Sequence, residues 1–219
     1  MKLEGKKILF LGDSITEGVD ASKYKNCYVE RVKQLAKLGE AVNYGISGTR
    51  FAKQNIPSET ATFDLDFVTR ASQMEENADA VVVFGGTNDF GHGDAPFGQI
   101  SDTSYNTFCG ACDELFGKLI EKYPDIPIIV LTPLHRLGEN DTVNEIGLKR
   151  KTLSEYADVI RVKAQKYSIP VLDLFAKSNM QPNVEAQNSI YFTDGLHPND
   201  NGHNRIAKLL ISFLENTVD

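Results

Sequence analysis

The sequence predicts an α/β fold, specifically a three-layer αβα sandwich around a mostly parallel sheet of five strands. The first observation behind this prediction is that short, strongly apolar runs recur along the chain. The second is that longer segments, with apolar residues spaced at the helical period, lie between these runs. Strands that alternate with helices form parallel sheets, and right-handed crossovers place the helices on both faces of the sheet.

Five runs are predicted to be strands because they are short and rich in apolar, largely β-branched residues, as strands buried on both faces are. In chain order the predicted strands are Lys7–Leu11, Ala41–Tyr44, Ala80–Phe84, Ile126–Leu131 and Ile169–Leu172. Ligands of open α/β sheets lie beyond the carboxyl ends of the strands. The residues that follow each run are therefore the first candidates for a functional site.

Apolar residues with helical spacing predict helices between and after these runs. The predicted helices are Tyr28–Leu38, Tyr105–Tyr123, Leu148–Tyr167 and Ile206–Leu214. The segments Asn55–Asp66 and Gly91–Ser104 are predicted to be long loops, which in a compact domain are often functional. No repeat, low-complexity tract or linker divides the sequence, so residues 1–219 are expected to form a single domain with one core.

Composition and charge exclude some classes of function. The 30 acidic and 23 basic residues give a net charge of −7, which would repel nucleic acids and anionic membrane surfaces. The N-terminal segment lacks the long apolar region and cleavage site of a signal peptide, and no stretch approaches the roughly 20 apolar residues of a membrane span. The sequence therefore predicts a cytoplasmic protein with a small-molecule partner and leaves its oligomeric state open.

The sequence has three cysteines, Cys27, Cys109 and Cys112. A disulfide framework needs an even and usually larger number, so none is expected. Cys109 and Cys112 have the spacing of a redox motif, so a dithiol oxidoreductase is one alternative function, and it requires a thiol pKa well below about 8.5. The pair falls in the apolar stripe of a predicted helix, which favours two core residues instead. No second pair has a spacing that would complete a zinc site, so no metal is expected.

A serine follows the first predicted strand, in the segment Gly12-Asp13-Ser14. A serine just beyond a buried strand and beside glycine has an exposed hydroxyl with a backbone N–H next to it, as a nucleophile requires. The alternative is a helix N-cap, a role that serine often fills. The segment is not the Gly-x-Ser-x-Gly elbow of α/β-hydrolases, because Ile15 and Thr16 stand where the second glycine should follow.

Glycines and an asparagine follow the next two predicted strands. The second strand leads into Asn43–Gly48, and the third strand leads into Gly85–Asp89. A glycine N–H and the side-chain amide of Asn88 can donate hydrogen bonds to an oxyanion that develops on a substrate. Taken separately, each segment is also compatible with an ordinary turn.

A carboxylate and an imidazole stand three residues apart near the C-terminus, at Asp194 and His197. In such a turn the carboxylate can accept a hydrogen bond from Nδ1–H, which leaves Nε2 free to act as a base. Two other histidines have the same spacing from an aspartate. His203 is expected to pack at the start of the last helix, and His92 lies in a predicted loop, where a catalytic orientation is hard to hold. Pro198 stiffens the chain directly after His197 and favours that histidine.

Together these segments resemble the block signature of the SGNH hydrolases, also called GDSL esterases and lipases. The matching blocks are Gly12-Asp13-Ser14, Asn43 to Gly48, Gly86-Thr87-Asn88-Asp89 and Asp194-Gly195-Leu196-His197-Pro198. They occur in the family's order, and each lies at the end of an apolar run or in the C-terminal loop. Each block alone is a weak signal, but all of them in order are a strong one.

The resemblance implies a flavodoxin-like fold and a catalytic triad of Ser14, His197 and Asp194. It also implies an oxyanion hole made of the backbone N–H groups of Ser14 and Gly48 together with the side chain of Asn88. No cofactor or metal ion is implied. Members of the family hydrolyse many kinds of ester, so the resemblance indicates the chemistry more closely than the substrate.

The predicted function is hydrolysis of carboxylic esters with a short, acetyl-like acyl group on a small or carbohydrate-like alcohol. The short acyl group is expected because the compact chain shows no obvious apolar lid that would bury a long acyl tail. Asp13, His92, His135 and Arg136 are candidate substrate-binding residues, and Asp13 is also expected to hold the loop around the nucleophile. The alternatives are a thioesterase or lysophospholipase that acts on longer acyl chains, and a non-catalytic module that binds a metabolite.

Overall fold

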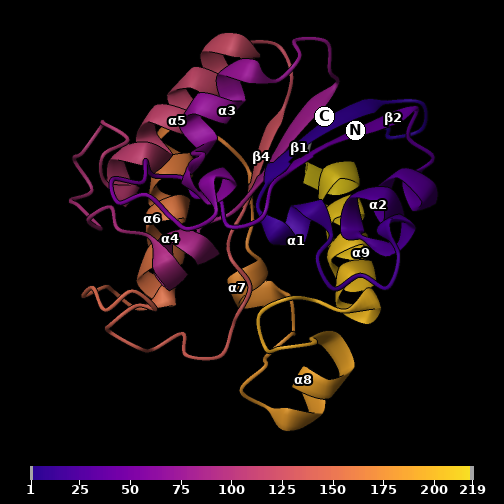
Figure 1. Cartoon of the computed structure of the whole chain (residues 1–219). Helices are drawn as coiled ribbons and strands as arrows, with labels where there is room; N and C mark the ends of the chain where they lie inside the picture. Colours follow the sequence, from indigo (N-terminus) through magenta and orange to yellow (C-terminus); the bar gives the residue numbers. More distant parts are fainter. Residues whose placement is uncertain (1, 218–219) are drawn as a thin grey trace.

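Five parallel strands form the central sheet of the computed structural model, which describes residues 2–217 (Figure 1). Neighbouring strands follow the order β2-β1-β3-β4-β5. Their bounds are β1 Lys7–Gly12, β2 Glu40–Gly45, β3 Ala80–Phe84, β4 Ile128–Leu131 and β5 Val171–Leu172. This is the flavodoxin-like strand order. The predicted α/β fold with five strands is therefore confirmed, and each of the described strand pairs is parallel.

Helices cover both faces of the sheet, which gives the molecule three layers (Figure 1). The helices α3, α5 and α6 pack on one face, α2 and α9 pack on the other, and α7 and α8 lie below the sheet in this view. The helix bounds are α1 Ser14–Glu17, α2 Tyr28–Ala36, α3 Phe67–Gln73, α4 Thr87–His92, α5 Phe108–Lys122, α6 Leu153–Lys166, α7 Leu174–Lys177, α8 Glu185–Tyr191 and α9 Asp200–Thr217. Within residues 2–217, no helix has the length and apolar character needed to cross a membrane.

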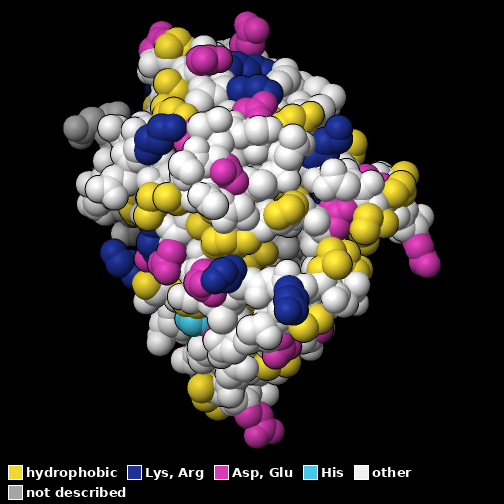
Figure 2. All heavy atoms as spheres, turned by 90° about the vertical axis from the view of Figure 1, so that its left-hand side faces the viewer, with side chains coloured by type: hydrophobic (Ala, Val, Ile, Leu, Met, Phe, Trp, Pro, Cys, Tyr) yellow, Lys and Arg dark blue, Asp and Glu magenta, His cyan; other side chains and the backbone are white. Residues whose placement is uncertain are grey.

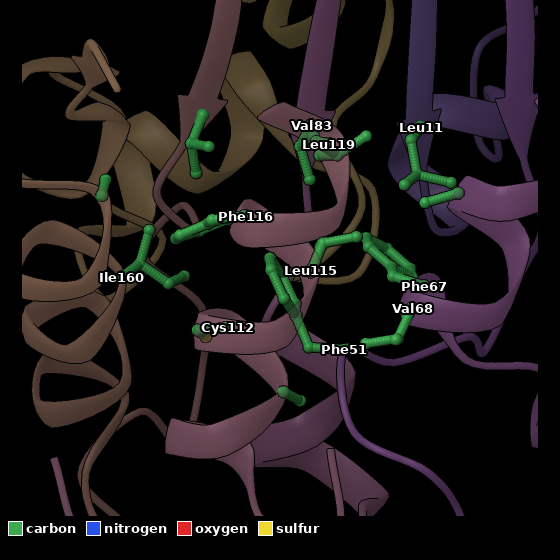
Figure 3. Close-up of a cluster of buried hydrophobic side chains, with 14 of the residues drawn as sticks. Leu11, Phe51, Phe67, Val68, Val83, Cys112, Leu115, Phe116, Leu119 and Ile160 are labelled. Carbon is green, nitrogen blue, oxygen red and sulfur yellow. The ribbon is translucent and has the colours of Figure 1, made fainter. Parts of the chain in front are cut away.

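Each face of the sheet has its own hydrophobic cluster, because side chains alternate along the strands. Leu11 of β1 points into the cluster shared with α3, α5 and α6, whereas its neighbour Phe10 points into the cluster shared with α2 and α9. Figure 3 shows the first cluster, in which the rings of Phe51 and Phe67 stack with their centroids 5.0 Å apart. Phe51 thereby anchors the segment that follows β2 to the core.

Capping interactions set helix starts that apolar spacing alone does not define. The helix α5 begins later than predicted, because the Thr107 side chain accepts a hydrogen bond from the Gly110 N–H. The helix α6 also begins later, because Thr152 and Glu155 form a capping box. By contrast, α9 begins earlier than predicted, at Asp200.

The two predicted long loops both contain helical structure. The prediction for Gly91–Ser104 is wrong at its start, because α4 continues to His92. The segment Asn55–Asp66 contains a single 3₁₀ turn, Ala61–Asp64. Its first residues donate backbone hydrogen bonds to the carboxylate of Asp94, so the two segments are held together at the surface.

Burial of the three cysteines contradicts the redox alternative. Cys109 and Cys112 lie on the face of α5 that packs in the cluster with α3 and α6. Burial raises the pKa of the Cys109 thiol to about 11 and raises the pKa of the Cys112 thiol well above its usual value. Because redox-active thiols have lowered pKa values, these cysteines are core residues, as the apolar stripe predicted.

The strand order changes direction at β1, which has β2 on one side and β3 on the other. Ligands of doubly wound sheets bind in the crevice at such a point. Gly12 at the end of β1 is aligned with Gly45 of β2 and with Phe84 of β3. The segments that follow these three strands therefore leave the sheet side by side, and they carry three of the predicted site blocks.

Candidate active site

Segments that are far apart in the sequence meet at the carboxyl edge of the sheet. Ser14 follows β1, Gly48 follows β2, Asn88 lies in α4 after β3, and His197 lies in the loop before α9. All of them line one cavity of about 350 Å³. The other lining residues are Val19, Ser47, Phe63, His92, Arg136, Glu145 and Leu196. The predicted blocks thus contribute to one site at the point where the strand order changes.

Ser14 is the first residue of α1, and Asp13 is the residue that caps this helix. The Asp13 carboxylate accepts a hydrogen bond of 3.0 Å from the Ile15 N–H. The structure therefore contradicts the alternative that Ser14 is an N-cap. Its hydroxyl makes no bond to the helix terminus and lies instead within hydrogen-bond distance of a histidine ring.

Ser14, His197 and Asp194 form a chain of hydrogen bonds. Ser14 Oγ lies 3.0 Å from His197 Nε2, and His197 Nδ1 lies 2.7 Å from Asp194 Oδ2. Burial raises the pKa of Asp194, but hydrogen bonds from His197 and Leu196 outweigh it and hold this pKa below its usual value. A charged Asp194 accepts Nδ1–H, which leaves Nε2 able to accept the serine proton.

A tight turn sets the orientation of both the imidazole and the carboxylate. Asp194 Oδ1 accepts the backbone N–H groups of Leu196 and His197, at 2.9 and 2.7 Å. Gly195 has a φ of +81°, in the left-handed region that favours glycine. The Thr193 N–H donates to the His197 carbonyl at 3.0 Å and closes the turn. The short Asp-x-x-His spacing therefore holds the pair by backbone as well as side-chain contacts.

Three N–H donors border the same cavity. The backbone N–H groups of Ser14 and Gly48 have no hydrogen-bond acceptor among residues 2–217. Asn88 Nδ2 donates one hydrogen to the Thr49 carbonyl at 3.0 Å, which fixes the amide and leaves its second N–H available. Gly48 has a φ of +75°, and a Cβ there would lie 2.3 Å from the Phe63 ring. Unpaired N–H groups at a cavity wall are suited to hold an oxyanion.

Asp89 holds the segment after β2, which carries Gly48, close to Asn88. The sequence did not predict this role for Asp89. Its buried carboxylate accepts the backbone N–H groups of Phe51 and Ala52, each at 3.0 Å. Burial raises its pKa to about 6, against the opposing effect of these hydrogen bonds. The sequence feature that could have pointed to Asp89 is its position directly after Asn88 in the third block. The contacts tie the segment after β2 to α4, and therefore Gly48 to Asn88.

Arg70 on α3 is a second supporting residue, and nothing in the sequence pattern marked it. Its guanidinium donates to the carbonyl oxygens of Gly12 and Tyr44 and to the Thr49 hydroxyl. It is buried and so links the ends of β1 and β2 beneath the cavity. This is a structural role for a charged group, since it satisfies backbone acceptors at the point where two strands end.

His92 lines the cavity, and a buried arginine fixes its orientation. Arg50 Nη1 donates to His92 Nδ1 at 2.7 Å. Burial, with a further contribution from the positive charge of Arg50, lowers the pKa of His92 to about 4. A neutral ring that accepts at Nδ1 carries its proton on Nε2. The expectation that a loop would leave His92 poorly oriented is therefore wrong, and the ring is a fixed, neutral donor.

The remaining candidate substrate-binding residues differ in their placement. Arg136 lines the cavity and forms an ion pair of 2.9 Å with Glu145. His135 does not line it, because Nδ1 pairs with Glu139 at 2.7 Å and the ring packs on Phe175. Asp13 is also outside the lining and is almost fully buried. The structure thus brings His92 and Arg136 to the cavity but not the other two candidates.

Replacement of Asp13 by asparagine is expected to stabilise the protein at pH 8 but not at pH 4. Burial raises the pKa of Asp13 from 3.8 to about 7. The unfolded chain therefore loses this proton at a lower pH than the folded chain, and the charged carboxylate destabilises the folded state progressively between about pH 4 and pH 7. Asparagine is uncharged and keeps the oxygen that caps α1.

Urea unfolding at both pH values measures this effect. The expected gain in the free energy of unfolding at pH 8 is on the order of 4 kcal/mol. The control Asp13→Ala removes the cap as well, so it should be less stable than Asp13→Asn at both pH values. An equal difference between Asp13→Asn and the parent at pH 4 and pH 8 would contradict the prediction.

One group of potential metal ligands occurs within residues 2–217. Asp20, Asp194 and His197 offer ligand atoms within 4.8 Å of one another. Asp194 and His197 Nδ1 already share a hydrogen bond, so a cation would displace the contact that orients the imidazole. Serine-based hydrolysis requires no metal ion. The group therefore overlaps the hydrogen-bonded chain of Ser14, His197 and Asp194.

Comparisons with known proteins test the predicted family relationship. The model of the GDSL-like Lipase/Acylhydrolase family matches residues 10–205. A solved structure of a protein from Lactobacillus plantarum is 30% identical, with a TM-score of 0.83 and coverage of 99% of this chain and 100% of that chain. A possible lipase from Chitinophaga pinensis is 24% identical, with a TM-score of 0.66 and coverage of 96% and 98%.

A two-domain esterase active on acetylated mannans is 23% identical, with a TM-score of 0.66, and the alignment covers 99% of this chain but 51% of that chain. No curated protein matched the sequence. The family match spans most of the chain and includes every predicted block, so the predicted relationship is confirmed. This chain belongs to the GDSL-like lipase/acylhydrolase family.

Proposed function

We propose that this protein is a serine carboxylic ester hydrolase whose nucleophile is Ser14. Membership of a lipase/acylhydrolase family implies ester hydrolysis. The observation that carries the residue assignment is the distance of 3.0 Å between Ser14 Oγ and His197 Nε2, with Asp194 on the far side of the ring. Nucleophile, base and orienting carboxylate are thus in the arrangement that acyl transfer requires.

In the proposed reaction, His197 Nε2 accepts the Ser14 proton as Oγ attacks the ester carbonyl carbon. The carbonyl oxygen becomes negatively charged and accepts hydrogen bonds from the N–H groups of Ser14 and Gly48 and from Asn88. Asp194 stabilises the imidazolium that forms. The imidazolium then gives its proton to the leaving alcohol, and water repeats the cycle on the acyl-enzyme to release the acid.

Covalent labelling with a fluorophosphonate tests this proposal directly. The reagent should add one phosphonyl group to Ser14, which mass spectrometry of the intact protein and of its peptides would locate. A non-catalytic metabolite-binding module, the alternative function, would remain unlabelled because its serine is not activated. Absence of labelling, together with no hydrolysis of p-nitrophenyl acetate, would reject the proposed function.

Replacement of Asn88 by alanine is expected to lower kcat by on the order of 100- to 1000-fold with little change in KM. The amide contributes most when negative charge is on the substrate oxygen, so its loss affects the transition state more than substrate binding. Steady-state kinetics with p-nitrophenyl acetate measures both constants, and thermal unfolding checks that the lost bond to the Thr49 carbonyl has not unfolded the chain. A change confined to KM would contradict an oxyanion role.

The acyl group of the substrate has two candidates. The sequence predicts a short, acetyl-like group on a small or carbohydrate-like alcohol, and a cavity of about 350 Å³ around Ser14 accommodates it. The second candidate is a longer acyl chain, as in a thioesterase or lysophospholipase. A specific feature favours the second, because an apolar cavity adjoins the catalytic one at Phe63.

A further inference from the structure

A second cavity, of about 560 Å³, adjoins the catalytic cavity. The two share Phe63, His92 and Glu145 as lining residues. The other walls of this side cavity come from the segments 54–59 and 146–148. The two cavities therefore meet at these three side chains.

Half of the ten residues that line the side cavity are apolar, namely Ile56, Pro57, Phe63, Ile146 and Leu148. The polar ones are Gln54, Ser58 and Glu59 of the segment 54–59, together with the shared residues His92 and Glu145. Ile56 is 58% exposed and Ile146 is 47% exposed, so both offer apolar surface to a bound group. Covering that surface removes it from water and stabilises the complex.

Apolar exposure alone does not distinguish this site. Figure 2 shows several groups of hydrophobic side chains on the face over α5 and α6, with charged side chains scattered among them. What distinguishes Ile56 and Ile146 is that they line a concave space that shares a wall with the catalytic cavity. Concave apolar surface with a few polar groups is typical of small-molecule sites.

The polar groups at the shared edge are held in place and carry no unpaired charge. Arg50 donates both to His92 Nδ1 and to the Phe63 carbonyl, at 2.7 and 2.6 Å, so one buried side chain fixes both walls. His92 is neutral at physiological pH, and Glu145 is paired with Arg136. An apolar chain can therefore pass this edge without desolvating an unpaired ion.

The chemistry of the reaction decides which half of an ester enters the side cavity. The leaving alcohol must lie beside His197, because this ring donates the proton to the departing oxygen. Val19, Leu196 and His197 line the catalytic cavity but not the side cavity. The edge shared by the two cavities lies instead at Phe63, which packs against Gly48. With the alcohol beside His197, the half of the ester that can extend past Phe63 is the acyl half.

We propose that the side cavity is an acyl-chain site, so that the enzyme prefers esters with a medium-length linear acyl chain over acetyl esters. This inference rests on the proposed function of Ser14 as nucleophile. The preference differs from the short acyl group predicted from sequence, because two surface loops supply the apolar walls that a lid was expected to provide.

A series of p-nitrophenyl esters from acetate to dodecanoate tests the proposal with the unaltered chain of 219 residues. The expected kcat/KM rises by up to about fourfold for each methylene that becomes buried, and then levels off when the side cavity is full. A matched series of acetate esters, with alcohols of increasing length, should show no such rise. A rise with the alcohol instead of the acyl chain would overturn the assignment.

The variant Ile146→Asp places a charge on the wall of the side cavity. Ile146 is exposed and is far in sequence from Ser14, Asp194 and His197. Octanoate hydrolysis is expected to fall by about tenfold or more, because the methylene groups of the octanoyl chain lose their apolar contacts in the side cavity. Acetate hydrolysis is expected to stay near the parent rate, because the acetyl group does not reach the side cavity. The control Val162→Asp changes a residue of α6 that is 48% exposed and lines neither cavity, and it should leave both rates unchanged.

The outcomes separate the acyl site from the proposed function. Labelling of Ser14 with a rate that falls from acetate to octanoate, or an Ile146→Asp variant with the parent's chain-length profile, overturns the acyl site and leaves the ester hydrolase intact. Loss of both labelling and hydrolysis for every ester overturns both. A chain-length preference that Ile146→Asp removes and Val162→Asp retains supports the proposal.

Discussion

Replacement of Ser14 by alanine is expected to lower kcat for ester hydrolysis by on the order of 10⁶-fold, with no change of fold. In the proposed mechanism Ser14 Oγ forms the acyl-enzyme, so in this variant water would have to attack the bound ester without covalent catalysis. Donors at Gly48 and Asn88 remain and should leave a small residual rate above that in water. Stopped assays over hours with p-nitrophenyl acetate measure this residual rate. The burst of p-nitrophenol that accompanies acyl-enzyme formation should be absent.

Ser47 provides the matched control, because it is the other serine that lines the catalytic cavity. Its hydroxyl donates to Glu17, which leaves it without a base in the arrangement that Ser14 has with His197. The variant Ser47→Ala should still take up one phosphonyl group from a fluorophosphonate, whereas Ser14→Ala should take up none. Hydrolysis by Ser14→Ala at the parent rate, or labelling of Ser47, would show that the nucleophile has been misassigned.

The sequence predicts those parts of the fold and site that depend on neighbouring residues. The run Ala80–Phe84 is apolar at every position, and it is a strand buried throughout. The turn at Asp194 and His197 is encoded within a few residues, since its hydrogen bonds join positions two or three apart. Local patterns of this kind specify strands, helices and tight turns without knowledge of distant contacts.

The supporting residues were not predictable because their partners are distant in the sequence. Arg70 is one of 23 basic residues in the chain, and its local sequence does not set it apart. Only the packed structure brings its guanidinium to the carbonyl oxygens of Gly12 and Tyr44. Arg50 is likewise undistinguished in sequence, yet it is 2% exposed and contacts His92. Charged side chains are usually solvated, so a sequence pattern favours exposure until the fold supplies buried acceptors.

His92 and His135 show the limit of predicting a site from strand ends. Both follow strands at the carboxyl edge of the sheet, but only His92 reaches the cavity. The local partner decides the outcome for His135, because Glu139 lies four residues on and holds Nδ1 away from the site. A position at the correct edge is therefore necessary for a site residue but does not determine where its side chain points.

Replacement of Asp194 by asparagine is expected to lower kcat by on the order of 10⁴-fold while the turn is retained. Asparagine keeps the oxygen that accepts the N–H groups of Leu196 and His197, so the backbone conformation should survive. Its amide would donate to Nδ1, however, and this favours the tautomer with the proton on Nε2. That nitrogen could then no longer accept the proton from Ser14, which is why a near-isosteric change has a large effect.

Asp20 is the control for this prediction, because its carboxylate lies within 4.8 Å of the ligand atoms of Asp194 and His197. If Asp194→Asn hydrolysed p-nitrophenyl acetate at the parent rate, Asp20 would be the group that orients the imidazole, and Asp20→Asn would then be the variant that loses activity. The hydrogen bond of 2.7 Å from Nδ1 to Asp194 favours the opposite result. Asp20→Asn should thus keep most of the parent's kcat, and the double variant should be no slower than Asp194→Asn, since a carboxylate that does not contact Nδ1 cannot select its tautomer.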